Sequence, residues 1–265
     1  MTAPTPTAEF ASLVYGPAGV PLDDPAEAFH EASRLYPDVA PGRLAALVEL
    51  ARSPELQQTV ARSSRTHEHR PGVELPDAGL GRARLARALA SRRSRPGPAG
   101  AALPQRALAA VLAAAHRSAG GRRAVPSAGA LYPLELYVAA LAVEAVDPAV
   151  YHYDPFRHRL ARLAPVDRDA VAAALVDDGL AANAAALVAV TAVFWRSRFK
   201  YGLRGYRFSL LEAGHLVQNA LLAAAAVGVP ALPLGGFYDR RLDALVGADG
   251  LDEASVYAFL LGGRA

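Results

Sequence analysis

Lys200 and its neighbour Tyr201 are the residues whose types most clearly suggest chemistry. The chain contains 27 arginines and one lysine. Lysine can lose its proton when it is desolvated, whereas arginine effectively cannot, so Lys200 is the one residue among these 28 that can become a neutral amine. Desolvation and nearby cations favour a neutral amine, and Arg198, Arg204 and Arg207 are close in sequence. A surface lysine retained by chance would give the same composition. The surroundings of Lys200 therefore decide between a catalytic base and a surface residue.

Three further clusters have residue types that suit a bound ligand. Residues 92–95 read Arg-Arg-Ser-Arg, and guanidinium groups beside a hydroxyl bind phosphate through charge-assisted hydrogen bonds. Residues 126–130 read Pro-Ser-Ala-Gly-Ala and residues 234–237 read Leu-Gly-Gly-Phe; small side chains there would let the backbone approach a flat ring. Each cluster alone is also typical of a solvated basic surface or an ordinary turn. Only their combination and order separate them from those alternatives.

Two regions of different character must position these clusters. Residues 1–80 read as a separate helical extension, because apolar residues recur at three and four spacing over 25–35 and 41–62. A polar, turn-rich stretch at 63–72 would link this extension to the rest. Residues 81–265 alternate between helical and extended patterns, which predicts a main domain that contains both helices and strands.

The main domain has several recognisable elements. The patterns predict helices over 85–91 and 105–118, strands over 134–141, 187–195 and 255–261, and a hairpin over 150–163. The strongest helix is expected over 209–227, with a capping box at its start and Gly228 and Pro230 after its end. Its nearly continuous apolar surface must be buried, in the domain centre or against a partner subunit. The segment 198–207, with glycines, cations and phenols in alternation, reads as a loop.

Composition excludes several functional classes. Cysteine is absent, which removes disulfides, thiolate nucleophiles, Cys-ligated zinc and iron–sulfur clusters. His67 and His69 lie in the polar linker without further ligands, so no metal site is expected. The longest apolar runs fall short of a membrane span, and the first residues do not resemble a signal peptide, so a cytoplasmic location is expected. The net charge of +3 is spread among acids, which argues against nucleic acid as a partner.

The motifs, taken together and in this order, resemble the nitroreductase-like flavoproteins and, more narrowly, the SagB-type dehydrogenases, which oxidise azoline rings in peptides. The resemblance covers about residues 81–265, and residues 29–36 are similar to the N-terminal extension of that subfamily. The motifs that carry it are RRSR at 92–95, PSAGALYPLELYV at 126–138, Tyr151-His152-Tyr153, KYGLRGYR at 200–207, EAGHLVQN at 212–219 and LGGF at 234–237.

The resemblance implies an α+β nitroreductase-like fold with a central sheet flanked by helices, a homodimer with the long helix in its interface, and FMN as cofactor. Lys200 and Tyr201 would be catalytic. The residues implied to bind FMN are Arg92, Arg93, Ser94, Pro126, Ser127, Ala128, Gly129, Gly235, Gly236 and Arg264. The implied substrate is a peptide, delivered by a cyclodehydratase complex or a carrier protein.

Three functions remain open at this point. The first is an FMN-dependent dehydrogenase that oxidises thiazoline or oxazoline rings to azoles. The second is a flavin reductase that passes hydride from NAD(P)H to a small or dehydroamino-acid acceptor, since one fold supports many reactions. The third is a flavin-free scaffold subunit of a biosynthetic complex. A serine hydrolase fits less well, because Ser127 does not lie in a G-x-S-x-G motif.

Overall fold

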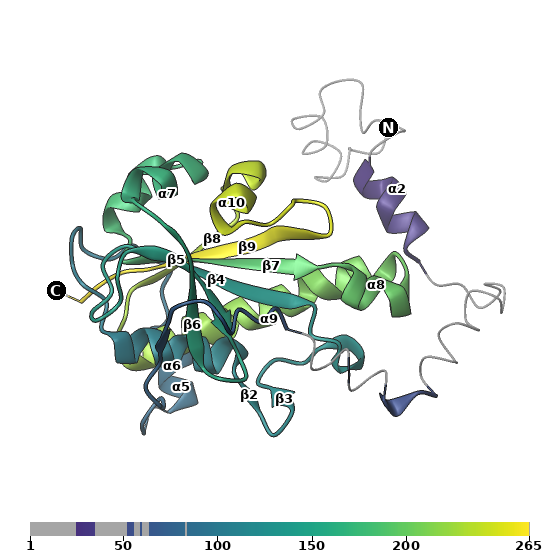
Figure 1. Cartoon of the computed structure of the whole chain (residues 1–265), viewed down its shortest axis with the longest axis horizontal. Helices are drawn as coiled ribbons and strands as arrows, with labels where there is room; N and C mark the ends of the chain where they lie inside the picture. The colour runs from purple at the N-terminus through teal and green to yellow at the C-terminus, as the bar shows by residue number, and fades with distance from the viewer. Residues whose placement is uncertain (1–24, 35–51, 56–58, 60–63, 83, 265) are drawn as a thin grey trace, which may run out of the picture.

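A seven-stranded antiparallel sheet, in the order β1-β6-β5-β4-β7-β9-β8, forms the centre of the protein (Figure 1). The computed structural model describes residues 25–34, 52–55, 59, 64–82 and 84–264. The strands of this sheet are β1 (Gly72–Glu74), β4 (Leu134–Ala140), β5 (Ala149–Asp154), β6 (Arg159–Pro165), β7 (Ala186–Val193), β8 (Ala231–Leu234) and β9 (Glu253–Leu261). A separate two-stranded ribbon pairs β2 (Ser118–Ala119) with β3 (Arg122–Arg123). The strands predicted from the sequence and the hairpin at 150–163 are confirmed.

Helices cover both faces of the sheet (Figure 1). One face carries α6 (Gln105–His116) and α9 (Arg204–Val227), whose apolar side chains pack with those of β4, β7 and β9 in one core. Helix α5 (Leu85–Ser91) lies beside α9. The other face carries α7 (Arg168–Ala174) and α10 (Asp239–Val246) over a second core. Because both faces are covered, every residue of β4 and β7 is buried, which explains why their sequences are apolar except for Glu135 and Thr191. The expected α+β fold with a flanked sheet is confirmed.

Helix α9 is longer than predicted. It starts at Arg204 rather than Ser209, so the expected capping box is wrong: the Ser209 hydroxyl donates to the Gly205 carbonyl within the helix. Its end at Gly228, in the left-handed conformation, is confirmed. By length and composition alone α9 could cross a membrane, but seven of its apolar residues are buried in the core that it shares with the sheet and α6.

The predicted loop at 198–207 is also wrong, because most of it is helical. Helix α8 (Trp195–Tyr201) leads through a short turn into α9. The two helices come so close that a Cβ on Gly205 would stand 2.8 Å from the Ser197 backbone. Glycine at this position allows the close contact, because it has no Cβ. Helix α8 was not predicted because its seven residues are a mixture of polar and aromatic types that shows no apolar period.

The N-terminal segment is attached to the main sheet. Strand β1 pairs with β6, so the predicted boundary at residue 80 leaves one strand of the sheet on the N-terminal side. Helix α2 (Pro25–Ala32) lies near α8, as Figure 1 shows. Most of the helix predicted over 41–62 lies outside the described residues. Two 3-10 turns, η1 (Ala128–Ala130) and η2 (Asp178–Asn183), complete the elements.

Candidate active site

Lys200 and Tyr201 meet the loop that carries Gly129. A Cβ on Gly129 would stand 2.7 Å from Tyr201 Oη and 2.9 Å from Lys200 Nζ, so the ends of both side chains converge on this glycine. The Tyr201 ring is held edge-on against Phe208 at 5.0 Å between centroids. Two of the clusters predicted from the sequence, 126–130 and 200–201, therefore lie together.

The loop at 127–132 has an unusual backbone. Gly129, Ala130 and Tyr132 all have positive φ angles, of 62°, 54° and 46°. Such conformations cost free energy in non-glycine residues and concentrate at functional sites. The Ser127 hydroxyl accepts a hydrogen bond from the Tyr132 backbone N–H at 2.9 Å, which closes the loop. The Tyr132 hydroxyl in turn accepts from the Arg123 backbone N–H at 3.3 Å.

Glu212 of α9 contacts this loop at Ser127. It was not predicted as a site residue. Glu212 is 3% exposed, and its carboxyl interacts with the side chain of Ser127. Burial raises the pKa of Glu212 to about 7, against the opposing effects of the Ser127 hydrogen bond and the Arg123 charge. In the sequence Glu212 completes the predicted capping box with Ser209, and only the burial that the fold creates gives it a different role.

Arginines gather at the other end of α9. Arg92, Arg93 and Arg95 line a pocket of about 120 Å³ together with Gly228 and Ala231, at the C-terminal end of α9 and the start of β8. Ser94 forms a β-bridge with Ala231, and Arg92 donates to the Ser94 hydroxyl at 3.2 Å. Arg264 reaches the same helix end, where its guanidinium contacts the Val227 carbonyl. The residues predicted to bind phosphate therefore form one positive cluster.

Gly235 and Gly236 follow β8, one strand length from the arginine pocket. A Cβ on Gly235 would meet no described atom within 4 Å, whereas one on Gly236 would stand 3.7 Å from Val176. The Gly236 carbonyl accepts a hydrogen bond from the Val176 N–H at 3.1 Å. Gly235 thus presents open backbone, as a ring-binding position requires, but Gly236 is engaged by the α7–η2 connection.

The two halves of the predicted site are far apart within this chain. The arginine cluster lies at the C-terminal end of α9, and Lys200 with Tyr201 lies at the N-terminal end (Figure 1). The 24 residues of α9 make it about 36 Å long. This distance exceeds the length of one FMN molecule. One chain therefore does not bring all of the predicted residues together.

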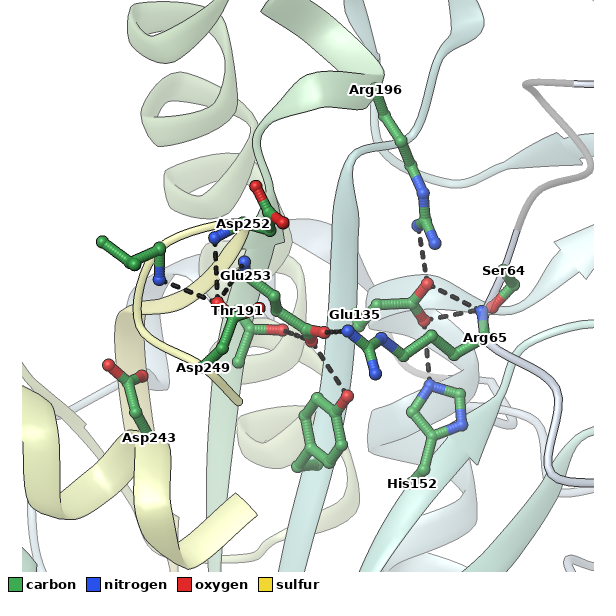
Figure 2. A network of polar contacts seen from close by, with 12 residues as sticks. Ser64, Arg65, Glu135, His152, Thr191, Arg196, Asp243, Asp249, Asp252 and Glu253 are labelled. Atoms are coloured by element: carbon green, nitrogen blue, oxygen red, sulfur yellow. Dashed lines mark hydrogen bonds and ion pairs between the residues drawn. The ribbon is translucent and has the colours of Figure 1, made fainter. Parts of the chain in front are cut away.

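A buried carboxylate contacts α8 through Arg196, as Figure 2 shows. Glu135 on β4 is fully buried and receives four hydrogen bonds, two on each oxygen. Arg196 of α8 donates at 2.6 Å and the Arg65 backbone N–H at 3.0 Å to one oxygen. The Ser64 hydroxyl at 3.0 Å and His152 Nε2 at 2.9 Å contact the other. Burial would raise the pKa of Glu135, but the His152 hydrogen bond and the charges of His152 and Arg196 hold it well below its usual range.

A second buried carboxylate, Glu253 on β9, lies beside the first (Figure 2). It accepts hydrogen bonds from Tyr137 at 2.9 Å and Thr191 at 2.6 Å, and Arg65 Nη2 lies 2.5 Å from its other oxygen. Burial, followed by the nearby Glu253 charge, raises the pKa of Tyr137. Neither carboxylate belongs to a cluster of three potential metal ligands, and the described residues contain no such cluster.

The sequence matches the profile described as the nitroreductase family over residues 90–263. The chain belongs to the nitroreductase family. This match contains the arginine cluster, the 127–132 loop, Lys200 and Gly235. It begins after the N-terminal segment that contributes Ser64 and Arg65.

Three curated relatives support the assignment. MJ1384 of Methanocaldococcus jannaschii, named provisionally as a nitroreductase, is 34% identical over 64% of this chain and 86% of its own length. The microcin B17-processing protein McbC of Escherichia coli is 34% identical over 44% of this chain and 46% of its length. The trifolitoxin-processing protein TfxB of Rhizobium leguminosarum is 28% identical over 53% and 39%. The match thus spans less than half of the length of McbC and of TfxB.

Solved structures confirm the fold. A protein of Anabaena variabilis, assigned provisionally as a nitroreductase, superposes with a TM-score of 0.67 at 23% identity, over 77% of this chain and 45% of that one. A chain of the E. coli microcin synthetase McbBCD complex with truncated pro-MccB17 gives 0.58 at 22% identity, over 89% and 86%. These similarities establish a shared architecture.

Proposed function

We propose that this protein is an FMN-dependent dehydrogenase that oxidises azoline rings to azoles in a peptide natural product. The proposal depends chiefly on one observation: Lys200 Nζ and Tyr201 Oη converge on the strained glycine loop at 127–132. Similarity to two proteins named for processing peptide toxins supports a peptide as the substrate. We further propose that a cyclodehydratase complex or carrier protein delivers this peptide in the cytoplasm.

The residues present fit FMN. Arg92, Arg93 and Arg95 surround a pocket, and none of them pairs with a carboxylate among the residues that the structure describes. Uncompensated guanidinium groups of this kind suit a phosphate. Gly235 offers open backbone for a ring, and Arg264 adds a further cation near the pocket. We therefore assign Arg92, Arg93, Ser94 and Arg264 to the phosphate side and Gly235 to the ring side, with Gly236 beside it held by its hydrogen bond from Val176.

Azoline oxidation removes one proton and one hydride from neighbouring ring carbons. When bound, FMN would accept the hydride. Lys200 and Tyr201 would take the proton, since both can serve as general bases or relay groups when correctly placed. The loop at 126–129, with its small side chains, would lie against the flavin ring and beside these two groups. The protein thus contributes position and proton transfer.

Each complete site requires two chains in this proposal. The phosphate-binding arginines and the Lys200 pair lie at opposite ends of α9, so a second copy must bring its Lys200 end to the arginine end of the first. Apolar side chains of α9 support such packing: Leu210 is 41% exposed and Leu211 is 61% exposed. We therefore propose a homodimer with α9 in the interface.

Lys200→Arg tests the catalytic assignment. Arginine keeps the positive charge but does not release its proton, so oxidation of an azoline peptide should fall by at least about 100-fold while FMN content stays unchanged. The measurement is azole formation by mass spectrometry with flavin absorbance as the control. Wild-type rates in Lys200→Arg would refute the role of Lys200 as a base.

A flavin reductase is distinguished by its electron donor. Anaerobic mixing with NADPH should leave the flavin absorbance of this protein unchanged over seconds, whereas an azoline peptide should bleach it. Prompt bleaching by NADPH with no response to the peptide would instead favour the reductase. A purified protein that contains no flavin and takes up none would favour the scaffold function.

A further inference from the structure

We propose that the N-terminal segment positions the helix that carries Lys200 and Tyr201, and that Ser64 and Arg207 are the positioning residues of this clamp. The inference rests on the proposed role of Lys200 for its effect on rate. The structural part of the proposal, that the N-terminal segment holds α8 in place, does not depend on that role. Two separate contacts, one at 64–65 and one through α2, hold the two ends of α8.

The first contact holds the start of α8 through Glu135 (Figure 2). This buried carboxylate receives Arg196, in the first turn of α8, and two donors from the N-terminal segment, the Ser64 hydroxyl and the Arg65 N–H. With His152 these four donors fill the lone pairs that a carboxylate offers. Removal of the Ser64 donor leaves a buried carboxylate incompletely satisfied, and the remaining donors, including Arg196, must shift to compensate.

The second contact holds the turn after α8. Arg207 donates to the His30 carbonyl at 2.5 Å and Arg204 to the Ser33 carbonyl at 3.2 Å, so two guanidinium groups engage the C-terminal end of α2. The Phe29 ring packs edge-on against Tyr206 at 5.3 Å between centroids, and Tyr206 stacks on Phe194 at 5.0 Å. Phe194 directly precedes α8. The aromatic stack therefore links α2 to both sides of the helix.

Helix α8 depends on these contacts because it has little burial of its own. It has seven residues, of which only Arg196 and Ser197 are buried. Trp195 is 51% exposed and Phe199 is 38% exposed on its outer side. A helix this short is marginal without tertiary contacts. The position of Lys200 is therefore set by what anchors the two ends of α8, and the N-terminal segment supplies part of both anchors.

Ser64→Ala tests the first anchor, and Glu68→Gln is its matched control. Glu68 lies four residues away in the same segment and forms an exposed ion pair with Arg157 at 2.8 Å, away from α8. Trp195, the only tryptophan of the chain, reports on α8 directly. Acrylamide quenching and fluorescence anisotropy of Trp195 are measured on holoenzymes of equal flavin content, together with kcat and KM for an azoline peptide.

Ser64→Ala should loosen Trp195 and lower kcat roughly tenfold with little change in KM, because displacement of a catalytic group affects mainly the chemical step. Ser64→Thr should restore both readings, and Glu68→Gln should change neither. Unchanged Trp195 fluorescence and kcat in Ser64→Ala would overturn the proposal. So would a shift of Trp195 without a change in kcat, or a fall in kcat without a shift of Trp195.

Arg207→Met tests the second anchor if Ser64→Ala fails to fold. It should give the same pair of changes, since Arg207 contacts α2 from outside the core. If the wild-type protein does not oxidise azolines, the proposed function fails, while the Trp195 measurements still decide whether the segment holds α8. A Trp195 signal insensitive to both substitutions would overturn the structural part.

Discussion

Gly129 combines a backbone conformation that favours glycine with direct contact to the two proposed catalytic side chains. Its φ of 62° favours glycine, and a Cβ would displace Tyr201 Oη and Lys200 Nζ. Gly129→Ala should fold with a loss of about 1 kcal/mol for the left-handed backbone, but lose activity by about 100-fold or more. Gly81→Ala is the matched control, because Gly81 has the same φ and a Cβ there meets no described atom within 4 Å. Thermal unfolding and azoline oxidation measure the two effects, and equal activities would contradict the convergence of these side chains.

Glu212 predicts a pH dependence of stability. Because burial raises its pKa from 4.5 to about 7, the folded state favours the protonated form. Its contribution to stability is fully present below about pH 4.5 and is lost as the pH rises to about 7. For a shift of this size the loss is on the order of 3 kcal/mol.

Glu212→Gln removes this titration and is the test of it. Urea unfolding of both proteins between pH 4.5 and 8 should show the wild type losing stability relative to the variant as the pH rises. The difference between the two proteins isolates Glu212 from every other titratable group, because those groups are the same in both. A difference that stays constant with pH would mean that Glu212 does not change its protonation state there.

Among the helices and strands, the packing of α8 against α9 depends on Gly205, since this residue lies where the two helices are closest. Its Cβ position lies 2.8 Å from the Ser197 carbonyl carbon and oxygen and 2.9 Å from the Arg198 nitrogen, all backbone atoms that cannot rotate away. Gly205→Ala should therefore destabilise the protein by about 2 kcal/mol and change the Trp195 emission. Chemical unfolding measures the first and fluorescence the second. An unchanged unfolding midpoint would show that the two helices can separate without cost.

The elements differ in how far the sequence predicts them. Buried strands such as β4 and β7, and helices with a regular apolar period such as α5, were predicted within two residues because local patterning and burial agree. Helix α8 was missed because its residues are polar or aromatic and its stability comes from tertiary contacts. The capping box at Ser209 was a chance match inside a longer helix.

The candidate site shows the same division. The arginines proposed to bind phosphate and the Lys200 pair follow from motif resemblance, and in the structure the arginines lie together and Lys200 lies beside Tyr201. Glu135 and Glu212 were not identified, since a carboxylate in a strand or helix carries no local sign of the four donors or the burial that define it. Their partners lie 17 to 85 residues away in sequence, at His152 and Ser127 among others, and only folding brings them together.

At the scale of the whole molecule, the length of α9 predicts that active sites are shared between chains. Arg93→Ala and Lys200→Ala should each abolish azoline oxidation. When the two variants are unfolded together and refolded as a mixture, half of the dimers should contain one of each, and one of their two sites should be intact. The mixture should recover about a quarter of the wild-type activity.

The refolded mixture is compared with each variant carried through the same procedure alone. Size-exclusion chromatography confirms that dimers have formed before activity is measured. No recovery in a dimeric mixture would show that each site is built from one chain. That result would mean that a conformational change within one chain brings Lys200 and the arginines at the other end of α9 together.

Because Lys200 is the only lysine, reagents that react with amines can label this protein at one side chain. Lys200 is partly buried and carries the only side-chain amine in the chain, so reductive methylation with isotope-labelled formaldehyde can modify only its Nζ and the α-amino group of the chain. The dimethylated amine would give one internal NMR resonance that reports on ligand binding at the 127–132 loop. A shift of that resonance on addition of a ligand would detect binding near Lys200 without the need for turnover.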